Sequence, residues 1–185
     1  MDGVNAEKKL KMDKNKILIV IDFQNDFVTG SLGTPQALAI VPKVKAKIDE
    51  YNKNGIPIIF TRDTHDANYL NTQEGKLLPV IHGIEDTEGW NIYDDLDGNC
   101  ACYVNKNTFG FQYWNNVTVC KNADEIELIG LCTDVCVVSN ALILKATYPE
   151  VKITVDASCC AGVTEESHKA ALLTMKSCQI NVINE

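Results

Sequence analysis

Short apolar segments alternate with longer amphipathic segments along this chain, and this alternation constrains the fold more than any other feature. Residues 17–21 are apolar and mostly β-branched, as expected of a strand buried on both faces of a sheet. Residues 35–54 instead carry apolar side chains at helical spacing and end before Gly55, a common helix stop signal. The repeated order of strand and helix predicts a parallel sheet covered by helices.

The remaining segments complete this pattern. We predict strands at residues 17–21, 56–61, 101–105, 125–131, 151–156 and 179–183, helices at residues 35–54, 133–147 and 164–177, and a long loop at residues 63–98. The predicted fold class is α/β, a three-layer α/β/α sandwich with a central, mostly parallel six-stranded sheet. We expect residues 16–185 to form this single domain, after a flexible N-terminal tail of residues 1–15.

Composition excludes several classes of function. The formal net charge is −8, which argues against nucleic acid or an anionic membrane as a partner. No apolar run approaches the roughly 20 residues of a membrane span. The charged N-terminus does not read as a signal peptide, so we expect a cytoplasmic protein whose eight cysteines are reduced.

Side chains with reactive or metal-binding chemistry follow four of the predicted strands. They are Asp22 after the first strand, Asp63 and His65 after the second, Lys106 after the third, and Cys132 and Cys136 after the fourth. The carboxyl ends of parallel strands meet at one edge of a sheet, so we expect these groups to gather there.

This set suits nucleophilic catalysis by a thiol. Cys136 falls in the first turn of a predicted helix, where the partial positive charge favours a thiolate. Lys106 would act in the same direction, and Asp22 is the natural acceptor of the thiol proton. A thiol redox protein using Cys132 and Cys136, or a binding module without catalysis, remains an alternative.

Three motifs carry a resemblance to a known family. Residues 22–27 (DFQNDF), 106–109 (KNTF) and 130–137 (GLCTDVCV) resemble the D-x-Q-x-D-F, K-x-x-[FY] and G-x-x-T-[DE]-x-C-V motifs of the isochorismatase-like cysteine hydrolases, which include nicotinamidases. The resemblance runs from about Lys16 to the C-terminus and implies a catalytic triad of Asp22, Lys106 and Cys136. It also implies a cis peptide between Leu131 and Cys132, an oxyanion hole formed by the N–H groups of Cys132 and Cys136, and a homo-oligomer.

The resemblance to the nicotinamidase branch further implies a metal site. Asp63 and His65 match its D-x-H segment, His82 matches its later histidine, and Glu74 falls where some members add a carboxylate. Such ligands suit Zn, Fe or Mn. Isochorismatases proper lack this set, so the resemblance points to a nicotinamidase or pyrazinamidase.

The expected reaction is deamidation of nicotinamide or a similar small amide to the acid and ammonia through a thioester, as part of NAD salvage. Phe27 and Tyr113 fall where nicotinamidases place aromatic walls for the substrate ring. A tryptophan that many of them carry before the second histidine is replaced here by Leu78 and Pro79. The acyl group is therefore left open, and another small amide, carbamoyl compound or vinyl ether is the alternative substrate.

Overall fold

The computed structural model describes residues 15–185 and contains one six-stranded sheet in the order β3-β2-β1-β4-β5-β6. Every neighbouring pair of strands is parallel, which confirms the predicted sandwich and makes its sheet fully parallel. The strands are β1 (Lys16–Ile21), β2 (Ile58–Asp63), β3 (Cys102–Lys106), β4 (Glu125–Leu131), β5 (Lys152–Ala161) and β6 (Asn181–Ile183). The α-helices are α1 (Asn25–Val28), α2 (Pro35–Lys53), α3 (Gln73–Leu77), α4 (Val138–Thr147) and α5 (Glu165–Ser177).

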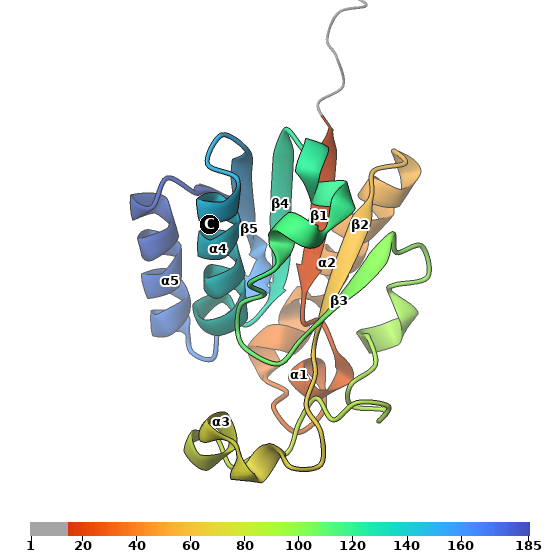
Figure 1. Ribbon diagram of the computed structural model, residues 1–185, viewed down its shortest axis with the longest axis vertical. Helices are drawn as coiled ribbons and strands as arrows, with labels where there is room; N and C mark the ends of the chain where they lie inside the picture. The colour runs from red at the N-terminus through yellow and green to blue at the C-terminus, as the bar shows by residue number, and fades with distance from the viewer. Residues whose placement is uncertain (1–14) are drawn as a thin grey trace, which may run out of the picture.

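Helices cover both faces of the sheet, α2 on one face and α4 with α5 on the other (Figure 1). Successive residues of β1 pack alternately against the helices on the two faces of the sheet. Leu18 and Val20 pack in the cluster that contains the buried face of α2, whereas Ile19 and Ile21 pack in the cluster that contains α4 and α5. Burying each such side chain contributes about 1.5–3 kcal/mol, so β1 is a main source of stability for both layers.

A buried ion network fastens α2 to the sheet. Lys47 of α2 lies 2.8 Å from Glu127 of β4 and 2.9 Å from Asp156 of β5. Glu127 also accepts a hydrogen bond from the Tyr51 hydroxyl at 2.6 Å and pairs with Lys16 at 2.8 Å. The carboxylates are thus compensated on all sides, as buried charges must be.

Besides α1, which was not predicted, two larger differences separate the structure from the sequence prediction. The strand predicted at residues 151–156 continues to Ala161, because Cys160 and Ala161 pair with Gly130 and Leu131 of β4. The region predicted as a loop at residues 63–98 contains α3, whose N-cap Thr72 accepts a hydrogen bond from the Gly75 N–H. Both departures lie at the carboxyl end of the sheet, where the strand arrows end in Figure 1.

The predicted tail of residues 1–15 lies outside the described residues except for Asn15. The backbone N–H of Asn15 donates to the Asp124 carboxylate at 2.9 Å, which holds this residue beside the start of β4. Within residues 15–185, no helix is both long and apolar enough to cross a membrane.

Candidate active site

Three side chains from different strands meet at the carboxyl edge of the sheet. The Lys106 ammonium at the end of β3 lies 2.6 Å from Asp22 Oδ2, just beyond β1. The same ammonium lies 3.6 Å from the Cys136 sulfur, which follows β4. All three residues are buried. The structure therefore brings together the carboxylate, ammonium and thiol that the sequence places at separate strand ends.

Burial and charge set the protonation of this group. Burial raises the pKa of the Asp22 carboxyl, against the opposing charge of Lys106. Burial likewise raises the pKa of the Cys136 thiol well above its usual range, although Lys106 again acts in the opposite direction. Burial acts to lower the pKa of Lys106, but its interactions with Asp22, Cys136 and Asp63 outweigh burial, so the pKa is raised. Burial of Cys136 therefore opposes the thiolate that the helix start and Lys106 favour, because loss of water disfavours the charged form of the thiol.

Thr61 holds the Asp22 carboxylate in place. Its hydroxyl donates to Asp22 Oδ1 at 2.6 Å and accepts from the Asp22 backbone N–H at 3.0 Å. Asp22 itself has a φ of 45°, in the left-handed region that aspartate tolerates better than most residues. Sequence reasoning missed Thr61, and the signal available was a hydroxyl residue directly after the apolar residues 58–60 of β2.

Cys136 lies in an irregular turn. The peptide between Leu131 and Cys132 is cis, as the family resemblance implies. Residues Thr133–Val137 then form one π-helical turn before α4, so Cys136 lies in a widened first turn of the predicted helix. The Cys132 carbonyl accepts hydrogen bonds from the N–H groups of Val135 and Val137, at 3.1 and 3.0 Å.

Asp63, His65, Glu74 and His82 form a second cluster, with one ligand atom of each within 4.8 Å of all the others. The Nε2 atoms of His65 and His82 lie 2.9 and 3.4 Å from Asp63 Oδ2, and each lies 3.8 Å from Glu74 Oε1. His82 Nδ1 donates to the Val80 carbonyl at 2.7 Å, which leaves Nε2 to face the cluster. Two imidazoles and two carboxylates converging in this way fit a divalent metal ion.

The first motif supports this cluster as well as the thiol. The side-chain amide of Gln24 accepts from the Asp63 N–H at 2.7 Å and donates to the Asp63 carbonyl at 3.0 Å. Asp26 Oδ2 accepts from the Gly83 N–H at 2.9 Å, and the Gly83 carbonyl accepts from the His65 N–H at 2.8 Å. Gly83 has a φ of +56°, and a Cβ there would lie 2.8 Å from the Asp63 carbonyl oxygen, so only glycine fits without movement.

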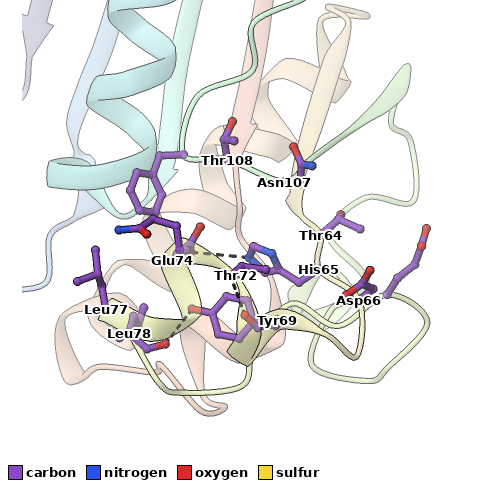
Figure 2. Close-up of a pocket in the computed structure, with 13 residues that line it drawn as sticks. Thr64, His65, Asp66, Tyr69, Thr72, Glu74, Leu77, Leu78, Asn107 and Thr108 are labelled. Atoms are coloured by element: carbon purple, nitrogen blue, oxygen red, sulfur yellow. Dashed lines mark hydrogen bonds and ion pairs between the residues drawn. The ribbon is translucent and has the colours of Figure 1, made fainter.

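A cavity of about 700 Å³ opens beside the cluster of Asp63, His65, Glu74 and His82, called the metal-type cluster below. Figure 2 shows His65 and Glu74 of the cluster pointing toward each other, with Tyr69 beside them. The wall is completed by Asn107, Thr108 and Phe109 of the segment after Lys106, and by Leu77 and Leu78 at the end of α3. Sequence reasoning singled out neither Tyr69 nor Leu77, because short helical turns within a long connection give no periodic signal, and it noted Phe109 only as the end of the KNTF motif.

The two predicted aromatic walls lie elsewhere. Phe27 is buried, and its ring packs edge-on against His82 with centroids 5.5 Å apart. Tyr113 is 52% exposed and its ring contacts Phe111. Neither side chain lines this cavity, and neither do Asp22, Lys106 and Cys136. The substrate contacts of Phe27 and Tyr113 therefore stay a prediction.

Comparison with known proteins agrees with the motifs. The protein-family model described as "Isochorismatase domain" matches residues 16–185. This chain belongs to the isochorismatase family. Among solved isochorismatase-like structures, the nicotinamidase PncA of Bacillus subtilis is 28% identical with a TM-score of 0.79, covering 92% of this chain and 99% of that chain.

Two further relatives add detail about this isochorismatase-family chain. The pyrazinamidase of Pyrococcus horikoshii, solved in complex with zinc, is 25% identical with a TM-score of 0.79 and covers 92% of this chain and 99% of that one. A probable inactive nicotinamidase of Arabidopsis thaliana is 27% identical over 185 residues, 89% of this chain and 89% of the relative. Likeness over the whole chain thus accompanies both active and probably inactive members, so activity must be argued from the site itself.

Proposed function

We propose that this chain, a hydrolase of amide C–N bonds, deamidates nicotinamide or a closely similar small heteroaromatic amide to its acid and ammonia. The observation that carries the proposal is the Lys106 ammonium, which lies 2.6 Å from Asp22 Oδ2 and 3.6 Å from the Cys136 sulfur. A buried thiol with both a cation and a carboxylate beside it suits nucleophilic attack on a carbonyl carbon.

The reaction begins with transfer of the Cys136 proton to Asp22. The pKa of the thiol and that of the carboxyl are both raised, so the thiol is protonated at rest and the carboxyl can hold the proton it receives. The sulfur then forms a bond to the amide carbon, and the carbonyl electrons move to oxygen. The backbone N–H groups of Cys132 and Cys136 donate hydrogen bonds to that oxyanion.

The second half of the reaction returns the protein to its starting state. Asp22 gives its proton to the amide nitrogen, the C–N bond breaks, and ammonia leaves a thioester on Cys136. Water adds to the thioester while Asp22 takes one of its protons. The carboxylic acid departs, and the thiol of Cys136 recovers the proton. Lys106 stabilises the negative charge that passes between sulfur and carboxylate.

Asp63, His65, Glu74 and His82 would hold the divalent metal ion, with Zn²⁺, Fe²⁺ and Mn²⁺ as the candidates. A bound ion supplies a fixed positive charge that orients a polar group of the substrate ring. The zinc complex of the Pyrococcus horikoshii pyrazinamidase supports this assignment.

The cavity favours an uncharged amide. Within the described residues, its lining includes Asp66, Glu74 and Glu85 but no lysine or arginine. Apart from the metal ion that the cluster would hold, an anionic substrate would find no counter-charge in this lining, whereas a neutral heteroaromatic ring can pack on Phe109, Leu77 and Leu78. The missing tryptophan before His82 keeps a second candidate open, a hydrolase of another small amide, carbamoyl compound or vinyl ether.

We infer a cytoplasmic homo-oligomer that acts in NAD salvage on a small molecule, without nucleic-acid or membrane partners. Size-exclusion chromatography with light scattering tests the oligomeric state, and fractionation of cells tests the compartment.

Ammonia release from an amide panel, combined with metal analysis of the purified protein, tests the proposed function. Nicotinamide and pyrazinamide should release ammonia well above a Cys136→Ala control, and the protein should carry about one divalent metal ion per chain. Release no greater than from that control would contradict the proposal. A Cys132→Ser variant that keeps its activity would argue against a redox function of the Cys132 and Cys136 pair.

A further inference from the structure

A fully buried asparagine, Asn140, lies one helical turn beyond Cys136 on α4, and the reaction steps above do not use it. Its Nδ2 donates to the Cys136 carbonyl at 2.9 Å and to the Phe109 carbonyl at 3.1 Å. Its Oδ1 accepts from the Phe111 N–H at 2.9 Å and from Trp114 Nε1 at 3.1 Å. These four bonds use both donors of the amide and two acceptor sites on its oxygen.

The surroundings determine which way this amide points. Both partners of Oδ1 are N–H donors and both partners of Nδ2 are carbonyl oxygens, so the reversed orientation would break all four bonds. Aspartate would lack the donors, and leucine would lack donors and acceptors. A buried polar side chain in the middle of a helix weakens the helix unless it is satisfied, so its benefit must lie in the contacts it makes.

Those contacts join the two halves of the reactive centre. The segment 109–114 follows β3, whose last residue is Lys106, and its first residue, Phe109, lines the cavity. The segment packs directly on α4, because a Cβ on Gly110 would lie 2.4 Å from Ile143 Cδ1. The helix on the other side of this contact begins directly after the turn that carries Cys136. Asn140 therefore bonds to the backbone of the nucleophile and to the backbone of the cavity wall at once.

We propose that Asn140 is a positioning residue that sets the Cys136 sulfur against the Lys106 ammonium and against the cavity wall at Phe109. The inference rests on the proposed cysteine-hydrolase function. Without Asn140 the segment 109–114 and the turn at Cys136 lose their shared anchor, and the reacting atoms move apart. A misplacement of about 1 Å can cost about 100-fold in rate, so the effect falls on kcat.

Two substitutions at Asn140 and one matched control test the proposal. Asn140→Asp keeps the acceptors but removes both donors. Asn140→Ser keeps a hydroxyl within reach of the Cys136 carbonyl but loses the hydrogen bonds to the segment 109–114. The control is Tyr148→Phe, which removes a hydrogen bond of 2.9 Å from the Tyr148 hydroxyl to the Trp114 carbonyl in the same region. The readouts are thermal unfolding, kcat and KM for ammonia release from nicotinamide, and the rate of Cys136 alkylation by iodoacetamide.

Both Asn140 variants should lower kcat by about 10- to 100-fold, with KM changed by less than about threefold. They should also slow alkylation of Cys136, whereas the control should leave both rates within about twofold of the wild type. A folded Asn140→Asp or Asn140→Ser protein with the wild-type kcat and alkylation rate overturns the proposal, as does a control that loses as much. If the wild type releases no ammonia, the proposed function fails, and the alkylation rates alone decide the role of Asn140.

Discussion

The carboxylate of Asp63 contacts the Lys106 ammonium through one oxygen and both cluster histidines through the other. Oδ1 lies 3.2 Å from Lys106 Nζ, while Oδ2 lies 2.9 Å from His65 Nε2 and 3.4 Å from His82 Nε2. Burial acts to raise the pKa of Asp63, but its bonds to the histidines and the charge of Lys106 hold that pKa well below its usual range. The metal-type cluster and the thiol centre therefore share one charged group.

Substitution of this shared carboxylate should damage both centres, whereas substitution of Glu74 should damage only the metal site. We expect Asp63→Asn to weaken metal binding by at least about tenfold and to keep a low kcat when metal is in excess, because Lys106 loses a partner. Glu74→Gln should also weaken metal binding but regain most of its kcat with added metal.

Metal content by mass spectrometry and ammonia release across added Zn²⁺ or Mn²⁺ measure the two effects. Asp66→Asn, a cavity residue outside the cluster, serves as the control and should retain its metal. Full recovery of kcat by Asp63→Asn in excess metal would show that the contact with Lys106 carries no weight in the reaction.

Cys136→Ala should lower ammonia release by at least about 1,000-fold, because the thiol forms the covalent bond. In the wild type, burial raises the pKa of this thiol above its usual value of 9.0, so little thiolate is present near neutral pH. Alkylation of Cys136 in the free protein should therefore rise steadily as the pH increases from 7 to beyond 9. Peptide mass spectrometry follows the modification of Cys136 separately from that of the exposed Cys178, and a rate that levels off below pH 7 would contradict the assignment.

Glu127→Gln should destabilise the protein by about 3 kcal/mol near neutral pH, because Lys16 loses its buried partner and Lys47 keeps only Asp156. Burial acts to raise the pKa of Glu127, but hydrogen bonds from Lys16, Lys47 and Tyr51 outweigh it and the pKa is lowered from 4.5. The stabilisation is thus complete above about pH 4.5 and is lost as the pH falls through the lower pKa of the folded state. The difference in free energy of unfolding between the variant and the wild type should therefore decrease at acidic pH.

Urea unfolding at several pH values measures this difference. Asp94→Asn removes the exposed pair between Lys45 and Asp94 and should change the free energy of unfolding far less. Asp94 has a φ of 54°, which asparagine also tolerates, so this control adds no backbone strain. Equal losses in the two variants would contradict a special role for the buried network.

Asp26→Ala should weaken metal binding by about tenfold, because the Gly83 N–H loses its acceptor beside His82. Asp26→Asn retains a side-chain oxygen in the same place and should bind metal nearly as the wild type does. Titration with Zn²⁺ in competition with a chelator compares them. An Asp86→Asn variant, which changes a charge in the segment that contains Gly83, is the control. Similar losses of metal affinity in all three variants would attribute the effect to charge alone.

The parallel sheet was predictable from the sequence because short segments rich in apolar residues alternate with helical segments, and in β1 and β2 the apolar residues are followed by polar ones. The same pattern located the three candidate catalytic residues, since Asp22 directly follows β1, Lys106 ends β3 and Cys136 lies in the first turn after β4. The extension of β5 through Ala161 was not predictable, because it depends on pairing with Gly130 and Leu131. A pairing partner 30 residues away in the chain leaves no mark on the periodicity of residues 157–161.

The supporting residues show a different limit. Asn140 lies in α4 among mostly apolar residues. Three of the four hydrogen bonds of its amide depend on Phe109, Phe111 and Trp114, which belong to a separate segment. Tyr113 has the right residue type for a ring-binding wall, yet its backbone turns it to the surface. Sequence patterns report burial along one element, whereas these roles arise where separate segments meet.

The stretch between β2 and β3 holds His65, Glu74 and His82 together with α3 and most of the cavity wall, while the thiol and the ammonium come from other parts of the chain. Three of the four candidate metal ligands and most of the cavity lining thus lie in one continuous stretch of about a fifth of the sequence. If the proposed function holds, substitutions within this stretch would alter metal affinity and substrate preference while Asp22, Lys106 and Cys136 stay unchanged.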